Sequence, residues 1–371
     1  MAADSERRHL LHVFSTFAVG GPQIRFIQLA NRLGRTYRHT VLAMDGDTAA
    51  ADRLDPALDC TVRGLNVVKG GAVSSGNLRT FRGVLAAEAP DVLLTYNWGS
   101  IEWALANRLP PSRRHLHFED GFGPDEASGR QIPRRVWMRR LALTGGKTRV
   151  IVPSQVLYDI ATKVWRLSPR RVIYIPNGID CDRFAAPADA AQNAAASLVI
   201  GSVGALRAEK NLGRLLTAVA ALPADLEPQV VIVGDGPARP GLEETAKSLG
   251  LADRVRFTGR MSAPETILPS FDVFAMSSDT EQMPVGLIEA MAAGRAVVAT
   301  DVGDIRSMVA EANRPYVVPL GDDAAYGRAL EELLRDPALR ARLGADNAAK
   351  ARATYDEATM VATYDRLFAG A

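Results

Sequence analysis

Cysteine and long apolar runs are both scarce in this 371-residue chain. The two cysteines, Cys60 and Cys181, lie far apart and match no zinc-ligand spacing. Two such thiols exclude a disulfide-stabilised secreted scaffold and favour a reducing cytoplasm. No stretch reaches the roughly 18 apolar residues that a membrane-spanning helix requires, and residues 1–11 lack the apolar core of a signal peptide. We therefore expect a soluble, cytoplasmic chain, with the inner face of the membrane as the alternative location.

An excess of charge of either sign is also lacking. Lysine and arginine total 44 against 42 acidic residues, which gives a net charge of +2. That balance argues against a dedicated nucleic-acid binder, which usually carries a strongly basic face. With 47% hydrophobic residues the chain can bury sizeable cores, and its length favours two domains. Arginine outnumbers lysine 38 to 6, so each lysine stands out.

Short runs rich in valine, leucine and isoleucine alternate with helix-length segments along most of the chain. This alternation is typical of βαβ units and of parallel sheets. In the first half the predicted strands are His9–Phe17, Thr40–Met44, Val92–Tyr96, His115–Phe118, Val150–Pro153 and Val172–Ile175. In the second half they are Leu198–Val203, Gln229–Val233, Val255–Phe257, Val273–Met276, Ala296–Ala299 and Tyr316–Val318.

The alternation stops at an alanine-rich segment, which predicts a linker. We expect a Rossmann-like domain at residues 1–180, the linker at 181–197 and a second Rossmann-like domain at 198–352. A helix at 353–371 is expected to return to the first domain. Two such doubly wound α/β domains would form a cleft, and ligands of open α/β sheets bind beyond the carboxyl ends of the strands.

Two loops of the first domain carry candidate chemistry. The pair Gly20-Gly21 separates the first strand from a helix, and paired glycines let a ligand approach the backbone, although a tight turn explains them equally well. His115 and His117 share one face of a strand, and the acidic residues Glu119 and Asp120 follow. Such a group fits a ligand or metal site, but buried structural histidines are commoner.

The second domain contains a more informative pair of loops. Arg207 and Lys210 lie three residues apart after a strand, and a guanidinium fork with an ammonium could clamp a diphosphate. Further on, Glu281 precedes a helix that should begin near Pro284. Glu289 then lies in an otherwise uncharged part of that helix. Burying a carboxylate there is costly unless it binds something, and the free amides of the helix start suit phosphate oxygens.

At this point the chain resembles family 4 glycosyltransferases, which are retaining enzymes of the GT-B fold. The block Glu281–Gly294, with its two glutamates eight residues apart, and the following Ala296–Gly303 look like the signature of that family. The Arg-x-x-Lys-Asn sequence at 207–211 and the segment Ile175–Asp180 agree with it. The resemblance implies an α/β chain with two doubly wound Rossmann-like domains and an interdomain cleft.

The resemblance also implies roles for individual residues. The implied catalytic residues are His117, Glu281, Lys210 and Arg207. The implied donor-binding residues are Gly20, Gly21, Arg207, Lys210, Gly259, Glu281, Gln282, Met283, Pro284, Val285 and Glu289. Among them, the two cations would hold the donor diphosphate, Glu289 the ribose hydroxyls and Glu281 the donor sugar, with His117 beside the transferred sugar. Glu119 and Asp120 are acceptor-side candidates or a source of a carboxylate near the reacting centre.

No metal and no cofactor is expected, since Arg207 and Lys210 would neutralise the phosphates. The sequence Asp45-Gly46-Asp47 matches the short metal-binding pattern of another glycosyltransferase fold, but a chance match to so short a pattern is commoner. The transition state would be oxocarbenium-like. The resemblance further implies same-face attack, with the departing diphosphate as base.

The partners we expect are a UDP- or GDP-sugar donor and a saccharide or lipid-linked acceptor, as in the synthesis of cell-surface polysaccharide or glycolipid. The stretch Arg134–Leu143 predicts a basic helix with a tryptophan. It fits a surface helix that packs one side inward, and it also fits weak contact with anionic lipid. Two other functions remain as hypotheses: a sugar-nucleotide epimerase, which would turn over its substrate without an acceptor, and a binding module without activity.

Overall fold

The computed structural model describes residues 7–65, 67, 74–122, 126, 131–185 and 197–370. The chain divides into two compact units. Unit 1 comprises Met1–Pro176 and Met360–Ala371, and unit 2 comprises Asn177–Thr359. The first division falls after Pro176, close to the expected boundary at residue 180.

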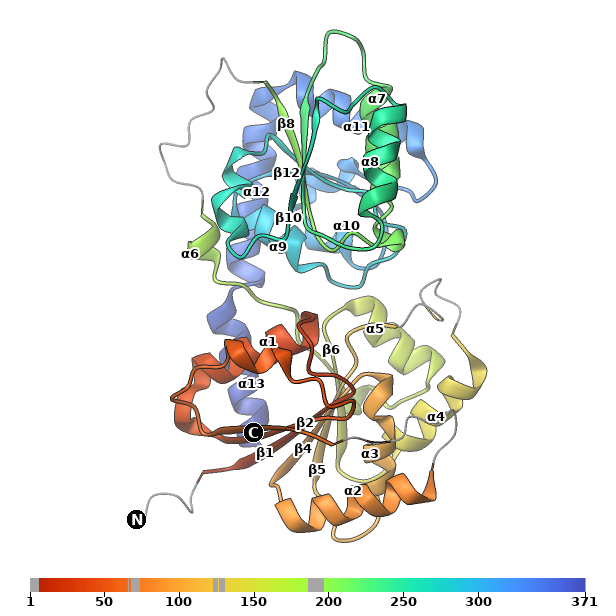
Figure 1. Ribbon diagram of the computed structural model, residues 1–371, viewed down its shortest axis with the longest axis vertical. Coiled ribbons are helices and arrows are strands. Elements are labelled where there is room, and N and C mark those ends of the chain that lie inside the picture. The colour runs from red at the N-terminus through yellow and green to blue at the C-terminus, as the bar shows by residue number, and fades with distance from the viewer. Residues whose placement is uncertain are drawn as a thin grey trace. The chain divides into compact units, whose positions relative to one another are not determined.

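Unit 1 is built on a seven-stranded parallel sheet with the order β3-β2-β1-β4-β5-β6-β7. Its strands are β1 (His9–Phe14), β2 (Arg38–Ala43), β3 (Cys60–Gly64), β4 (Val92–Tyr96), β5 (Arg114–Phe118), β6 (Thr148–Val152) and β7 (Val172–Tyr174). Helices cover both faces of the sheet (Figure 1). They are α1 (Gly21–Leu33), α2 (Ser75–Glu88), α3 (Ile101–Ala106), α4 (Pro133–Thr144) and α5 (Gln155–Asp159).

Unit 2 contains a six-stranded parallel sheet with the order β10-β9-β8-β11-β12-β13. Its strands are β8 (Val199–Val203), β9 (Gln229–Val233), β10 (Val255–Gly259), β11 (Val273–Met276), β12 (Ala296–Thr300) and β13 (Val317–Val318). The helices are α6 (Cys181–Phe184), α7 (Leu212–Ala220), α8 (Arg239–Ser248), α9 (Val285–Ala292), α10 (Ile305–Met308), α11 (Asp323–Arg335) and α12 (Pro337–Thr354). They too lie on both faces of their sheet (Figure 1).

The apolar runs of the sequence become the central strands of these sheets. Every residue of β1, β4 and β12 is buried, because helices pack on both sides of a parallel sheet. In unit 2, one core joins α7, α8 and α11 to one face of the sheet, and a second joins α9 to the other face. In both units the order of strands reverses next to the first strand, which is where doubly wound sheets bind ligands.

The chain returns to unit 1 at its end. Helix α12 begins at Pro337, where the side chain of Asp336 accepts the amide hydrogen of Leu339. Helix α13 (Glu357–Ala369) follows, and its residues from Met360 onward belong to unit 1. Tyr364 is fully buried there beside Phe118 of β5. Within the described ranges, no helix combines the length and apolar character needed to cross a bilayer.

One strand escaped the sequence-based prediction, and one predicted segment is different in part. Strand β3 lies at the sheet edge and is half exposed, so it lacks an apolar signal. Residues Cys181 and Phe184, expected in the linker, instead form the ends of helix α6 and are buried against the core of α9. Residues 186–196 of the expected linker lie outside the described residues.

Candidate functional site

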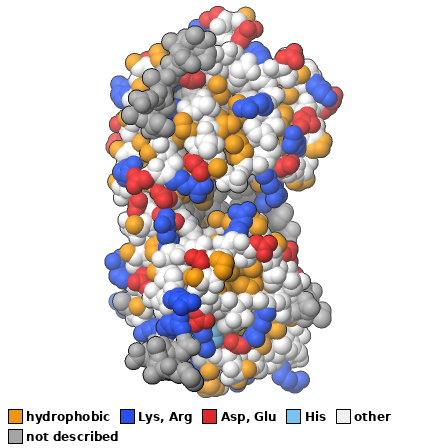
Figure 2. Space-filling model, turned by 60° about the vertical axis from the view of Figure 1, so that its left-hand side comes forward, with side chains coloured by type: hydrophobic (Ala, Val, Ile, Leu, Met, Phe, Trp, Pro, Cys, Tyr) orange, Lys and Arg blue, Asp and Glu red, His pale blue; other side chains and the backbone are white. Residues whose placement is uncertain are grey.

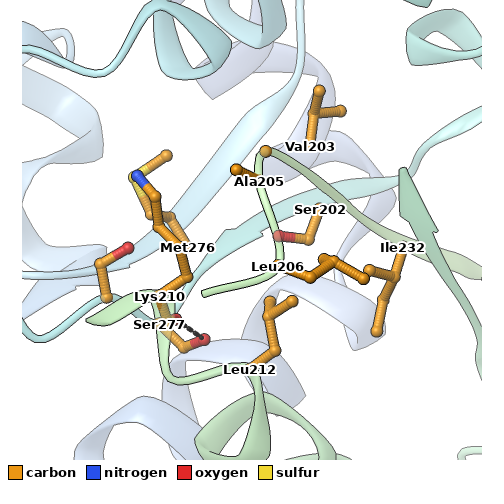
Figure 3. A pocket seen from close by; sticks show the side chains of 11 residues that line it. Ser202, Val203, Ala205, Leu206, Lys210, Leu212, Ile232, Met276 and Ser277 are labelled. Atoms are coloured by element: carbon orange, nitrogen blue, oxygen red, sulfur yellow. Dashed lines mark hydrogen bonds between the residues drawn. The ribbon is translucent and has the colours of Figure 1, made fainter. Parts of the chain in front are cut away.

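Two loops meet at the carboxyl edge of the unit 2 sheet. The loop after β8 leads through a 3-10 turn, Ala208–Lys210, into α7, and Asn211 caps that helix with its side-chain oxygen. Asn211 also donates from its side-chain nitrogen to Asp279, in the loop after β11. The amide of Asp279 in turn donates to the carbonyl of Glu209. The hydroxyl of Ser277 donates to the carbonyl of Lys210, a bond drawn in Figure 3.

These hydrogen bonds between the two loops bring Lys210 and Glu281 together. The Lys210 Nζ atom lies 2.5 Å from Glu281 Oε1, and Ser278 Oγ donates to the same oxygen at 2.7 Å. The side chain of Glu281 is 8% exposed and that of Lys210 26%. The ammonium is therefore held in place yet remains open on one side. Sequence reasoning named both charged residues but missed Ser278.

Arg207 lies in the same loop but is not fixed there. Its side chain is 63% exposed, and its nearest acid is Glu209 at 3.6 Å. A cavity of about 20 Å³ lies behind this loop, between the ends of β8 and β11 and the stem of Lys210 (Figure 3). That is room for about one water molecule. The exposed face of the loop, rather than this cavity, is thus where a ligand of any size would lie.

Close backbone packing shapes both loops, at glycines that sequence reasoning did not single out. Gly234 has a φ of +140°, and a Cβ there would lie 1.8 Å from the carbonyl oxygen of Gly204. Gly303 has a φ of +57°, and its Cβ would lie 2.3 Å from the carbonyl oxygen of Glu281. Any other residue at these two positions would displace the loops that carry Lys210 and Glu281.

Helix α9 begins beside these loops. Pro284 occupies its N-cap without a side-chain cap bond, and Val285, its first residue, is 40% exposed. Met283 by contrast is buried in the unit 2 core, and its carbonyl accepts a bond from Asn177. The carbonyl of Gln282 accepts the amide of Asp304. The Met283 side chain is therefore unavailable to a ligand, and only its backbone could serve the predicted role.

Glu289 lies on α9 in a half-buried position. Burial raises the pKa of its carboxyl to about 7; Arg183 opposes that rise and Glu265 adds to it. Those two residues pair with each other, since Arg183 Nε donates to Glu265 at 2.8 Å. No described residue donates a hydrogen bond to the side-chain carboxyl of Glu289, although its backbone carbonyl accepts the amide of Ala293. Gly259, another of the predicted donor-binding residues, ends β10 with a φ of +73°.

The structure places His117 differently from the sequence prediction. His117 is fully buried, and both ring nitrogens have partners: Thr95 Oγ1 at 2.8 Å and Glu119 Oε2 at 3.3 Å. Thr95 also contacts His115, which reaches Thr148 on the next strand. Strand β5 is a central strand covered on both faces. The side chain of His117 therefore has no exposed surface in this conformation for the expected contact with a sugar.

The acidic pair after β5 is held by two arginines. Glu119 is fully buried against Arg139, whose guanidinium also contacts Glu126. Three aromatic rings surround that guanidinium at 4.9–5.2 Å, those of Trp98, Phe122 and Trp165.

Asp120 is more open than its neighbour. It pairs with Arg25 of α1, and its side chain is 12% exposed. Its backbone N–H donates to Asn97 Oδ1 at 2.7 Å. Of the two acceptor-side candidates, then, Asp120 alone reaches the surface.

The remaining predicted positions of unit 1 are turns. Gly20 is the N-cap of α1, and a Cβ there would lie 2.8 Å from Gln23 Oε1, whereas a Cβ on Gly21 would have open space. Asp45 and Asp47 accept backbone amides two residues ahead, as turn residues do. Within the described part of the chain no group of three His, Cys, Asp or Glu side chains could hold a metal ion.

Comparison with known proteins gives matches over both units. The family model "Glycosyl transferase 4-like domain" matches residues 20–178, and "Glycosyl transferases group 1" matches residues 188–350. The chain is 31% identical over 212 residues to the lipopolysaccharide core biosynthesis glycosyltransferase LpsD of Rhizobium meliloti, covering 57% of this chain and 61% of that protein. It is 37% identical over 152 residues to the alpha-D-kanosaminyltransferase of Streptomyces kanamyceticus, covering 40% and 39%. The chain thus spans about 40–60% of these two relatives.

Solved structures resemble the chain over nearly its whole length. Sucrose-phosphate synthase from Thermosynechococcus elongatus superposes with a TM-score of 0.80 at 22% identity, covering 98% of this chain and all of that one. The Anabaena protein HepE in complex with UDP-glucose gives a TM-score of 0.81 at 18% identity, with 98% and 100% coverage. At such identities the likeness establishes the fold alone.

Proposed function

This chain belongs to the family 4-like glycosyltransferases of the GT-B fold, and from that premise we propose that it transfers a sugar from a nucleoside-diphosphate donor to an acceptor. The proposed acceptor is a saccharide or a lipid-linked saccharide in the synthesis of cell-surface polysaccharide or glycolipid. The names of LpsD and of the neighbour WaaG, "a glycosyltransferase involved in lipopolysaccharide biosynthesis", support that class.

The observation that carries the proposal is the fixed Lys210–Glu281 pair at the carboxyl edge of the unit 2 sheet. The donor diphosphate would lie against the open side of the Lys210 ammonium, where the exposed Arg207 can swing in and fork two oxygens. Both cations would stabilise the negative charge that develops on the leaving diphosphate. Since they supply this charge, we propose that the reaction needs no metal ion.

Glu289 is proposed to bind the ribose of the donor. Its carboxyl has no hydrogen-bond partner among the described residues, and burial raises its pKa to about 7. Two ribose hydroxyls would donate to it and compensate the cost of burial. Glu281 would orient the donor sugar through its outer oxygen while Lys210 and Ser278 hold the inner one.

We propose retention of configuration, with attack on the same face as the leaving diphosphate and a transition state of oxocarbenium character. The proposed role of His117 is to position Glu119, to which its ring is bonded, instead of contacting the sugar. Asp120, which reaches the surface beside Arg25, is the better candidate on the acceptor side.

Helix α4 is a proposed point of weak contact with anionic lipid. Trp137 is 60% exposed and Leu141 39%, one helical turn apart, while Arg134 and Arg140 are exposed beside them. A tryptophan and a leucine flanked by arginines suit the membrane interface. Flotation with phosphatidylglycerol vesicles should weaken in Trp137→Ser; equal flotation of both proteins would remove this contact from the proposal.

The decisive experiment is thermal melting of the purified chain with UDP-, GDP- and ADP-sugars in the presence of EDTA. A donor at 100 times its dissociation constant adds about 2.7 kcal/mol of stability. We expect one nucleotide to raise the melting temperature, and Arg207→Ala and Lys210→Ala to abolish the rise. The matched control is Arg328→Ala, an exposed arginine of α11.

Three results would contradict parts of this proposal. If no donor shifts the melt, or if Arg328→Ala lowers the shift as much as Arg207→Ala, the donor site is wrong. Conversion of the nucleotide sugar without any acceptor would favour an epimerase. A donor-dependent shift together with metal-dependent turnover would overturn the metal-free mechanism alone.

A further inference from the structure

A second basic region of unit 1 has no part in the proposed reaction. It is a groove of about 570 Å³ lined by Arg114, Gly146, Lys147, Thr148, Arg149, Ser168, Arg170 and Arg171. Arg114 and Thr148 are the first residues of β5 and β6, and Arg171 directly precedes β7. The groove thus lies at the amino ends of these strands, whereas Glu119 and Asp120 follow the carboxyl end of β5.

This groove is strongly basic, whereas the chain as a whole is nearly neutral. Its described lining contains five cations and no carboxylate, although the whole chain has a net charge of only +2. Elsewhere the charges are mixed: on the face shown in Figure 2, red acidic side chains lie among the blue basic ones in both units. Lys147, Arg149 and Arg170 are exposed and form no ion pair with any described residue.

Main-chain oxygens hold the other two cations in place. Arg114 donates to the carbonyls of Leu367 and Phe368 at the end of α13, the latter at 3.1 Å. Arg171 donates to the carbonyls of Gly146 and Thr148, both at 3.1 Å. A neutral carbonyl fixes a guanidinium and leaves its positive charge in place, whereas a carboxylate would neutralise it.

Like charges lie close to Arg114 in this groove. Burial, and then the like charges of Arg8 and Arg149, lower the pKa of its guanidinium. Gathering like charges on one wall costs stability, and the fold does not need the exposed members for packing. A ligand of opposite charge would offset this cost.

We propose that this groove binds a ligand carrying two or more phosphate groups, at a site separate from the donor site. Two partly buried guanidinium groups, held by carbonyls, and three exposed cations match several phosphate oxygens at once. The volume falls in the range of small-molecule sites. The phosphates can belong to a free polyphosphorylated molecule or to anionic lipid headgroups, and the groove recognises the chemistry that both share.

The first test is calorimetric titration of the full chain with inorganic tripolyphosphate. The background is the Arg207→Ala, Lys210→Ala variant, which removes the donor site as a competing phosphate site. In that background, adding Arg149→Glu and Arg170→Glu should weaken binding about tenfold or more, since two exposed charge contacts are reversed. The control pair Arg79→Glu and Arg328→Glu makes the same change of charge at exposed arginines outside the groove.

A second arm identifies the source of the phosphates. Wild type, groove variant and control are floated with phosphatidylglycerol vesicles and with phosphatidylcholine vesicles. Selective loss of tripolyphosphate binding supports a free ligand, and selective loss of phosphatidylglycerol binding supports headgroups as the source. If the groove variant matches the control in both arms, the proposal is overturned. The milder Arg149→Gln, Arg170→Gln pair keeps the test valid should charge reversal disturb folding.

This inference is independent of the proposed function. The groove variant in the otherwise unchanged chain should keep the full melting shift with the nucleotide sugar. The Arg207→Ala, Lys210→Ala chain should in turn keep its tripolyphosphate site. Loss of one binding event without the other shows which of the two proposals has failed.

Discussion

Replacing Glu289 with glutamine should make unit 2 more stable at alkaline pH, even though it removes a proposed ligand contact. The pKa of the buried carboxyl is about 7, against an ordinary value of 4.5. The folded chain must therefore carry a buried carboxylate above pH 7, at a cost of about 1.4 kcal/mol for each pH unit between the two values. Glutamine has the same shape and carries no charge at any pH.

The sign and the size of the effect follow from linkage. Below pH 4.5 the carboxyl is neutral in both the folded and unfolded states, so the variant and the wild type should be equally stable. As the pH rises, the unfolded state ionises first and the wild type loses relative stability. The variant should gain under about 1 kcal/mol at pH 5 and about 3 kcal/mol at pH 8.

The assay must report on unit 2 by itself. All four tryptophans lie in unit 1, at 98, 103, 137 and 165, so their fluorescence serves as an internal control that should not change. Hydrogen exchange of peptides from α9 and β11, measured at pH 5 and pH 8, follows unit 2. Glu244→Gln is the matched control, because the Glu244 side chain is 77% exposed on α8. Equal stability of Glu289→Gln and wild type at pH 8 would refute the burial argument.

Three further predictions concern the stability of each unit by itself. Burial lowers the pKa of His39 to about 4, so His39 by itself should cost unit 1 about 2 kcal/mol of stability between pH 7.5 and pH 5, because the unfolded state takes up the proton first. Burial also lowers the pKa values of His12 and His115 in unit 1, which adds to the loss. Urea midpoints from tryptophan fluorescence measure the total, and His39→Gln should reduce the loss by about 2 kcal/mol without abolishing it. Arg139→Leu leaves the buried Glu126 without its main partner and should cost about 3–5 kcal/mol, seen in the same urea midpoints; an unchanged midpoint would contradict the buried-pair argument. Gly234→Ala should destabilise the chain by more than about 2 kcal/mol, because Gly234 has a φ of +140° and lies against the carbonyl of Gly204. Gly327→Ala, which has open space on α11, should instead stabilise the chain by about 0.5–1 kcal/mol. Equal melting temperatures of the two variants would contradict both predictions.

Apolar periodicity predicted most of the sheet strands because parallel strands are buried on both faces. The runs Gln229–Val233 and Val273–Met276 were predicted with the bounds that the structure has. Strand β3 was missed since it is an edge strand with exposed alternate residues. The short helix Cys181–Phe184 was read as linker, because four residues are too few for a helical period.

Loop chemistry was predictable only in part. The pairing of Lys210 with Glu281 joins residues 71 positions apart, and the sequence indicated each of them but not their contact. Gly234 and Gly303 escaped notice because nothing in their local sequence shows that another backbone approaches them. His117 looked accessible at the end of its strand, but the burial of β5 depends on helices from distant parts of the chain.

The sequence by itself determined the two parallel α/β units, the kind of chemistry at the ends of their strands and the family to which the chain belongs. These features depend on local periodicity and on short motifs, which a single chain displays directly. Only the tertiary structure decided which charges pair, which acids are buried and where five cations gather at the amino ends of β5, β6 and β7. Burial and pairing arise when segments far apart in the chain pack together, and that packing sets the local dielectric and hence the pKa and availability of each group.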